Sequence, residues 1–365
     1  MTLNKALLLA LLLTGLSIPN RLTGADFRHI LLRKYTYNPF DGPRVLGEMV
    51  WRHADGRFLE DCTFELSGND ADKFRIRDGE LIMRSGARND LRELLTARIS
   101  ITAKIDDLVL ATEDIVLVQD RFATNKTIAH RGAWKVANVP QNSMASLAAA
   151  QNLGCAGSEI DVYMTSDSII ILNHDPTYAK MKVESVTAKQ LRNKPLPNGE
   201  PLPLLSDILR QTQTGNNTRL IIEIKSSSVG KAHALACTDR IVSMVQETGS
   251  QGWVEYISFD YDIVKRVIFW DPYAKVAYLN GDFTPEFLVK EGITGIDYNL
   301  AVLRNNPDWI PQARELGLTT NVWTVNTPED MEYFLDQEID VITTDEPALL
   351  IEKVENRQNG RKGEE

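Results

Sequence analysis

The chain has 365 residues, of which 43% are hydrophobic and 25% are charged, and its formal net charge is -10. This length suits one barrel of about 250 residues plus a smaller module, and the composition excludes a chain that is disordered throughout. The negative charge argues against nucleic acids or anionic lipid surfaces as partners, because the summed field of the protein repels polyanions. An anionic substrate would therefore need locally placed positive side chains.

The N-terminal residues predict export from the cytoplasm. A single lysine, Lys5, precedes an almost unbroken apolar run over residues 6–16, and small residues follow at 23–25. This pattern is typical of a signal peptide, which we place at residues 1–25, and the run falls short of the ~20 apolar residues needed to span a bilayer. We therefore expect a periplasmic or extracellular mature protein without stable membrane insertion.

The cysteines predict neither a disulfide framework nor a structural zinc site. Their number is odd, and their spacing lacks the paired pattern of zinc ligands. We expect them to be small buried side chains. They are Cys62, Cys155 and Cys237.

Residues 26–120 have the pattern of a small β-sandwich domain. Apolar and polar residues alternate with period two at 74–76, 97–103 and 114–118. Such alternation predicts antiparallel strands with one buried face. The stretch 64–120 resembles a cadherin-like or immunoglobulin-like module. That resemblance would make its acidic residues candidate calcium ligands, and the alternative is that they form a solvated face.

From Thr127 onward the pattern changes to short apolar strands that alternate with helical segments, which is typical of a parallel α/β fold. The predicted strands are 127–131, 157–162, 219–225, 254–259, 275–279, 294–298, 319–325 and 340–344. Helices are predicted at 143–152, 231–247, 262–270, 308–316 and 328–336, with a short return strand at 169–172. This series predicts a closed TIM (β/α)8 barrel over 121–356, followed by a frayed polar tail at 357–365.

Polar side chains close several of these strands, at the end where a barrel carries its catalytic groups. The segments concerned are His130-Arg131-Gly132, Glu159-Ile160-Asp161, Asn173-His174-Asp175 and Glu223-Ile224-Lys225. Histidines, carboxylates, an arginine and a lysine therefore converge on one mouth of the predicted barrel.

Glu159 and Asp161 lie two apart on one strand, so both carboxylates point to the same side, and Glu223 joins them from the next strand. Three clustered carboxylates cannot remain ionised unaided, because like charges and desolvation raise their pKa values. A divalent cation resolves this conflict, and ligation by oxygen alone suits Mg²⁺ or Ca²⁺. The alternative is that Arg131 and Lys225 neutralise the acids in internal salt bridges.

His130 and His174 are candidates for proton transfer, since both sit at strand ends beside charged neighbours. Cleavage of a phosphodiester needs one group that accepts a proton from the attacking hydroxyl and another that protonates the departing alkoxide. Arg131 and Lys225 could neutralise phosphate oxygens, and the arginine offers a bidentate fork.

Residues 127–350 carry an ordered series of short motifs. They include His130-Arg131-Gly132, Pro140-Gln141-Asn142-Ser143, Glu159-Ile160-Asp161-Val162, His174-Asp175, Glu223-Ile224-Lys225, Ser258-Phe259, Trp323-Thr324-Val325-Asn326 and Thr344-Asp345-Glu346-Pro347. Taken in this order, the motifs closely resemble the glycerophosphodiester phosphodiesterase family. The resemblance implies a TIM barrel that hydrolyses glycerophosphodiesters to glycerol 3-phosphate and an alcohol. It also implies an acid/base pair, phosphate-binding residues and metal ligands: His130 and His174; Arg131 and Lys225; Glu159, Asp161 and Glu223.

One position departs from the family pattern. Most members carry glutamate where this chain has Gln141, an amide that forms hydrogen bonds but supplies no charge. We expect Gln141, Asn142, Phe259 and Trp323 at the substrate pocket, where the indole either stacks on a group such as choline or is a buried barrel aromatic. Two other functions stay open. One is a phospholipase D-like activity on lysolipids, and the other is a catalytically silent binding module, which Gln141 would suit.

Overall fold

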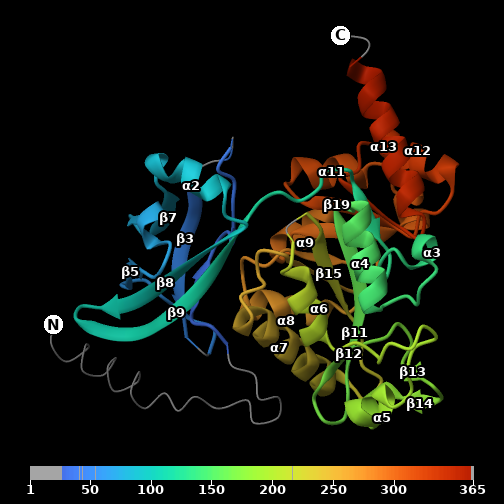
Figure 1. Cartoon of the computed structure of the whole chain (residues 1–365), viewed down its shortest axis with the longest axis horizontal. Coiled ribbons are helices and arrows are strands. Elements are labelled where there is room, and N and C mark those ends of the chain that lie inside the picture. The colour runs from blue at the N-terminus through green and yellow to red at the C-terminus, as the bar shows by residue number, and fades with distance from the viewer. Residues whose placement is uncertain (1–26, 41, 43, 54, 216, 363–365) are drawn as a thin grey trace.

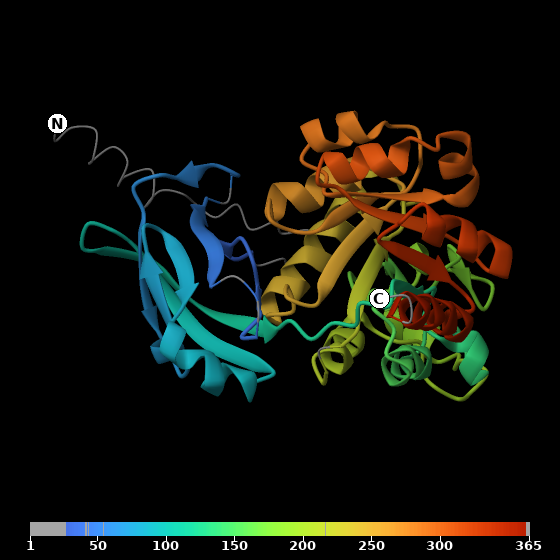
Figure 2. The same ribbon diagram turned by 90° about the horizontal axis from the view of Figure 1, so that it is seen from above.

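The computed structural model describes residues 27–40, 42, 44–53, 55–215 and 217–362, and it shows two bodies joined by a single extended segment at 120–126 (Figures 1 and 2). The first body consists mainly of strands, and the second combines strands with helices. The predicted signal peptide at 1–25 lies outside the described residues. Within the described part of the chain, no helix has the length and apolar character required to cross a membrane.

The N-terminal body contains two β-sheets around an apolar core that includes Phe74, Leu81, Ile99 and Leu117. The larger sheet has the order β1 (Ile30–Leu32), β3 (Val45–Arg52), β7 (Glu80–Met83) and β6 (Phe74–Arg77), with β4 (Phe58–Leu59) paired to β3. The smaller sheet has the order β2 (Thr36–Tyr37), β9 (Leu108–Gln119), β8 (Thr96–Ile105) and β5 (Thr63–Ser67). The long β8–β9 pair is antiparallel, and the short β2 adds to β9 in parallel. The predicted all-β class is confirmed, with the short helices η1 (Ala71–Lys73), η2 (Ser85–Ala87) and α2 (Arg88–Arg92) as additions.

The second body is a closed barrel of parallel strands, as predicted. The strands are β10 (Thr127–Ala129), β11 (Gly157–Met164), β15 (Arg219–Ile224), β16 (Val254–Ser258), β17 (Val276–Tyr278), β18 (Gly295–Asn299), β19 (Thr319–Trp323) and β20 (Val341–Thr344). The barrel closes because β10 pairs in parallel with both β11 and β20. The predicted return strand is β12 (Ile170–Leu172), which lies antiparallel against β11.

Helices cover the outside of the barrel, where their apolar faces pack on the strands. They are α4 (Met144–Leu153), α6 (Leu205–Thr212), α7 (Lys231–Glu247), α8 (Tyr261–Trp270), α9 (Pro285–Lys290), α10 (Leu300–Asn305), α11 (Trp309–Glu315), α12 (Pro328–Asp336) and α13 (Pro347–Lys362). The short helix α3 (Trp134–Ala137), which follows β10, has no buried residue. Between β12 and α6 the chain forms an insertion with β13 (Thr177–Tyr178), β14 (Met181–Lys182), η3 (Val183–Ser185) and α5 (Ala188–Arg192). The insertion has its own small core around Val183, Leu191 and Leu202, packed against Ile171 next to β11.

The prediction of a frayed tail at 357–365 is corrected for its first part. Helix α13 continues through residues 357–362. The reason is a tertiary contact, since the guanidinium of Arg357 donates to the carboxylates of Glu332 at 2.8 Å and Asp336 at 2.7 Å on α12.

The cysteine prediction holds for Cys155 and Cys237, which are buried and unbridged, and Cys62 is also free but only partly buried.

The N-terminal body packs on the flank of the barrel formed by α7 and α8. The rings of Phe27 and Trp270 stack with centroids 3.5 Å apart, and Arg28 donates to the side chain of Gln246 at 3.0 Å through its backbone N–H. Gly252 lies so close to Val118 that a Cβ there would approach a Val118 methyl to 2.4 Å. The contact therefore depends on close backbone approach.

Candidate active site

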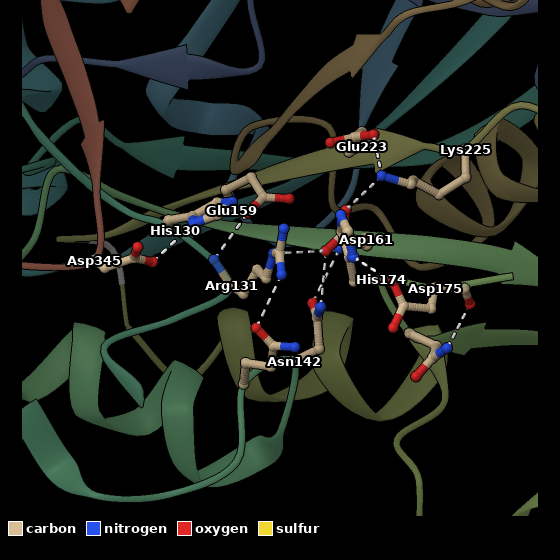
Figure 3. Close-up of polar contacts among 12 residues, drawn as sticks. His130, Arg131, Asn142, Glu159, Asp161, His174, Asp175, Glu223, Lys225 and Asp345 are labelled. Atoms are coloured by element: carbon tan, nitrogen blue, oxygen red, sulfur yellow. Dashed lines mark hydrogen bonds and ion pairs between the residues drawn. The ribbon is translucent and has the colours of Figure 1, made fainter. Parts of the chain in front are cut away.

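Polar side chains from different strands meet at the C-terminal end of the barrel (Figure 3). The turn after β10 places the first of them: Arg131 and Gly132 both have positive φ, 58° and 80°. A Cβ at Gly132 would lie 2.4 Å from Oγ of Ser146, so only glycine fits this turn against α4. The turn aims the Arg131 N–H at Oε2 of Glu159, which accepts it at 2.8 Å.

Glu159, Asp161 and Glu223 form a buried carboxylate cluster, as the strand spacing predicted. Each offers an oxygen within 4.8 Å of the others. Burial, together with the charges of Asp161 and Glu223, raises the pKa of Glu159 well above its ordinary value. Burial, together with Asp161, raises the pKa of Glu223 to about 7. The cluster is therefore unfavourable as three free anions.

The alternative of internal salt bridges holds for part of this cluster. Asp161 meets Nζ of Lys225 at 3.1 Å and Nε of Arg131 at 3.4 Å, and Lys225 also meets Glu223 at 2.6 Å. Although burial lowers it, the pKa of Lys225 is raised by these two carboxylates. Glu159 is different, because its Oε1 is buried without a hydrogen-bond partner among the described residues. An oxygen-only donor set with one unsatisfied carboxylate oxygen fits a hard divalent cation.

Each candidate histidine is held by a carboxylate. Nδ1 of His130 lies 2.8 Å from Oδ1 of Asp345, which follows β20, and Nδ1 of His174 lies 2.9 Å from Oδ1 of Asp175. Burial lowers the pKa of His174 below its ordinary value, although the negative charge of Asp161 acts in the opposite direction. With Nδ1 engaged, Nε2 of each ring is the nitrogen left for proton transfer to a substrate.

Most of these groups line one small cavity of about 120 Å³ at the barrel mouth, whereas the buried Asp161 contacts Arg131 and Lys225 of its wall without lining it. The predicted residues present there are His130, Arg131, Glu159, His174, Glu223, Lys225, Phe259 and Trp323. The rings of Phe259 and Trp323 meet edge to face at 5.4 Å, and the indole N–H donates to the carbonyl of Asp297 at 2.9 Å. Trp323 is thus both a cavity wall and a part of the barrel.

Two predicted pocket residues lie elsewhere. The Asn142 side chain is buried, donates to Oδ2 of Asp161 at 2.8 Å and accepts the Asp161 backbone N–H at 3.0 Å, so it positions a carboxylate. Gln141 accepts a hydrogen bond from Arg131 at 3.0 Å through its side-chain carbonyl. Both line a neighbouring, larger cavity instead of the small one. Gln141 therefore orients Arg131 without adding charge to the carboxylate cluster.

Sequence reasoning assigned no role to Asp345 or Asp297. The hydrogen bond from His130 keeps the pKa of Asp345 low despite burial, and Asn326 donates to its other oxygen at 2.8 Å. Asp297 lies buried on β18 and lines the small cavity, where burial, together with Glu223, raises its pKa to about 8. The sequence pattern could have indicated both residues, since Asp345 directly follows a predicted strand and Asp297 lies within one.

Comparison with known proteins identifies a family that this chain matches. The model of the glycerophosphoryl diester phosphodiesterase family matches residues 130–349. A glycerophosphodiester phosphodiesterase of Caldanaerobacter subterraneus is 28% identical over 244 residues, which cover 62% of this chain and 96% of that protein.

Solved structures of other proteins are also similar to this chain. A glycerophosphodiester phosphodiesterase from Parabacteroides distasonis shares 38% identity, with a TM-score of 0.63 over 65% of this chain and 99% of its own. An Oleispira antarctica phosphodiesterase in complex with its product sn-glycerol-3-phosphate is 19% identical, with a TM-score of 0.54 over 63% of this chain and 96% of its own, and shows the likeness of fold alone. The matched family segment begins after the all-β body, whose cadherin-like resemblance stays a prediction. With its barrel and ordered site residues, the chain belongs to the glycerophosphoryl diester phosphodiesterase family.

Proposed function

We propose that this protein hydrolyses glycerophosphodiesters to glycerol 3-phosphate and an alcohol in a reaction that depends on Mg²⁺ or Ca²⁺. The observation that carries the proposal is the single small cavity in which His130, His174, Arg131 and Lys225 surround a buried carboxylate cluster. Positive side chains suit a phosphodiester anion, and two carboxylate-held imidazoles suit paired proton transfer.

Glu159, Asp161 and Glu223 would hold the cation. When bound, it would supply positive charge that stabilises the phosphate oxygens as negative charge develops on them. Arg131 and Lys225 add fixed positive charge at the same place, and Gln141 and Asp161 hold the Arg131 guanidinium in position. Binding of the cation would also satisfy the carboxylate oxygen of Glu159 that has no partner in the described residues.

The two cavities suggest how the histidines divide the proton transfers. His130 lines only the small cavity, whereas His174 lines both the small cavity and the larger one beside it. We therefore assign His130 as the base that deprotonates the nucleophile, either water or the neighbouring hydroxyl of the substrate glycerol. If the hydroxyl attacks, the first product is a cyclic phosphodiester, which water then opens to glycerol 3-phosphate. His174 is the acid that protonates the departing alcohol oxygen as its bond to phosphorus breaks. The lowered pKa of His174 makes its protonated form a strong proton donor.

The test uses the purified mature protein after removal of bound cations with a chelator. Glycerophosphodiesters are incubated with chelator alone, with Mg²⁺ and with Ca²⁺, and both products are identified. We expect glycerol 3-phosphate only when a cation is present. Turnover that survives exhaustive chelation would remove the cation from the mechanism. Preferred cleavage of lysolipids would favour the phospholipase D-like activity, and inactivity on all substrates would favour a silent binding module.

We also propose that residues 1–25 direct export, on the basis of their apolar run and small flanking residues. The mass of the protein recovered from the periplasm or the medium should correspond to a chain that begins near Asp26. An uncleaved chain recovered from the cytoplasm would contradict this proposal.

A further inference from the structure

A second cavity of about 750 Å³ opens beside the small one. It lies between α3 with the loop that follows it and the insertion after β12, and His174 lines both cavities. Its lining includes Trp134, Lys135, Asn138, Gln141, Asn173 and Tyr178. The reaction as proposed above does not use this cavity for the phosphate or the cation.

The electrostatic character of this lining disfavours a cationic ligand. Among its described residues there is no carboxylate, and its one permanently charged side chain is Lys135, which pairs with Glu346 outside the lining. Gln141 lines this cavity with an uncharged amide. A choline or ethanolamine group would lose part of its hydration here and would meet no carboxylate among the lining residues.

Apart from Lys135, His174 and Tyr178, the polar side chains of the lining are neutral amides, and some of these keep hydrogen-bonding capacity. Gln141 uses its carbonyl oxygen for Arg131, which leaves its amino group, and the exposed Asn138 has no side-chain hydrogen bond within the described part of the chain. By contrast, the amino group of Asn173 is engaged by the backbone carbonyls of Asp175 and Thr177. Uncharged donors and acceptors of this kind match hydroxyl groups.

The remaining walls are apolar and partly aromatic. Leu172 and Leu202 are buried beneath the cavity, and Trp134 and Tyr178 border it with partly exposed rings. Amides that alternate with apolar and aromatic surface suit a ligand that carries hydroxyls on a carbon skeleton. An acyl chain would leave the amides dehydrated and unpaired, which is costly.

We infer that this larger cavity is the subsite for the leaving alcohol and selects a neutral polyhydroxy alcohol, of the class of glycerol, inositol or a sugar. The inference rests on the proposed diesterase function. In the reaction, the P–O bond to this alcohol breaks as the nucleophile oxygen bonds to phosphorus, and His174, which borders the cavity, gives its proton to the departing oxygen. His130 takes the proton of the nucleophile, so atoms and charge balance.

The experiment compares three diesters that share the glycerol phosphate part and differ only in the leaving alcohol, and a fourth diester that has choline as its leaving alcohol and carries an acyl chain on its glycerol. Glycerophosphoglycerol, glycerophosphoinositol, glycerophosphocholine and a lysophosphatidylcholine are assayed with the full mature protein and saturating Mg²⁺ or Ca²⁺. We expect a higher kcat/KM for the two polyol diesters than for the choline diester. A comparison of the two polyol diesters with each other shows which polyol fits the cavity better.

A variant that adds one negative charge to the larger cavity tests the inference directly. Asn138→Asp adds a carboxylate to the cavity at a residue with φ 52°, a conformation that Asp accepts, and it should shift the kcat/KM ratio toward choline about five-fold, as one partly exposed ion pair does. Asn305→Asp on the exposed surface of α10 makes the same chemical change away from the cavity and should leave the ratio unchanged. If Asn138→Asp does not fold, product inhibition of the wild type replaces it, with free glycerol or inositol expected to inhibit more strongly than choline.

The outcomes separate this inference from the proposed function. Cleavage of all diesters with choline preferred, or an unshifted ratio in a folded Asn138→Asp protein, overturns the polyol subsite and leaves the diesterase intact. Preferred cleavage of lysophosphatidylcholine assigns the cavity to an acyl chain and likewise overturns the inference. Release of glycerol 3-phosphate from none of the substrates removes the diesterase proposal and the subsite together.

Discussion

Glu159→Gln and Asp161→Asn should have opposite effects on stability, because the two buried acids have different surroundings. Glu159 accepts the Arg131 N–H at 2.8 Å, and its other oxygen has no partner among the described residues. A glutamine keeps the acceptor and turns an amino group toward the neighbouring carboxylates. Since burial and those carboxylates raise the pKa of Glu159, the amide relieves unfavourable charge. In chelator we expect the free energy of unfolding to stay equal or rise by about 1 kcal/mol.

Asp161→Asn removes a charge that has partners. The Asp161 carboxylate meets Lys225 at 3.1 Å and Arg131 at 3.4 Å, and it accepts from Asn142 at 2.8 Å. Removing one member of a buried ion pair costs about 3 to 5 kcal/mol, and the lower value applies here because Lys225 keeps Glu223 at 2.6 Å while Arg131 loses its carboxylate. We therefore expect Asp161→Asn to be destabilised by about 3 kcal/mol in chelator.

The assay is urea unfolding, first in chelator and then with Mg²⁺ or Ca²⁺. A cation at about 100 times its Kd should add about 2.7 kcal/mol to the wild type, and both variants should lose most of this gain along with their activity. The exposed residue Glu315 on α11 supplies the matched control Glu315→Gln, which should behave as the wild type in both conditions. If Glu159→Gln is as unstable in chelator as Asp161→Asn, the argument from clustered charge is refuted. A full cation gain in Glu159→Gln would remove that residue from the metal site.

Replacing either His130 or His174 should lower turnover by about 10²- to 10⁴-fold, and a 4-nitrophenyl leaving group should rescue only the His174 variant, since that group departs without a proton. Rescue of neither would contradict the divided roles. Asp345→Asn should lower kcat by about 10- to 100-fold and change the pH–rate profile, because the carboxylate 2.8 Å from His130 becomes a neutral amide; an unchanged profile would argue for a structural role alone. Burial raises the pKa of Asp271 from 3.8 to about 6, so the folded state binds this proton more tightly and stability falls as pH rises through that window. Urea unfolding should show a loss of up to about 3 kcal/mol that is missing in Asp271→Asn, and equal pH dependence in both proteins would rule out this source.

Local pattern by itself determined the barrel and most of its site. Each strand is an apolar run ended by polar residues, and the alternation of Glu159 and Asp161 places both side chains on one face whatever surrounds them. The barrel strands, the carboxylate cluster and the two histidines could therefore be predicted because their signals lie within a few residues of each other.

Only the tertiary structure decided what these residues touch. His130 and Asp345 lie 215 residues apart and meet because β10 pairs with β20 as the barrel closes. Packing between separate elements likewise turns Asn142 toward Asp161, holds Arg357 of α13 against α12 and forms the larger cavity between α3 and the insertion. Such contacts depend on packing between elements far apart in the chain, and the local alternation of apolar and polar residues carries no information about that packing.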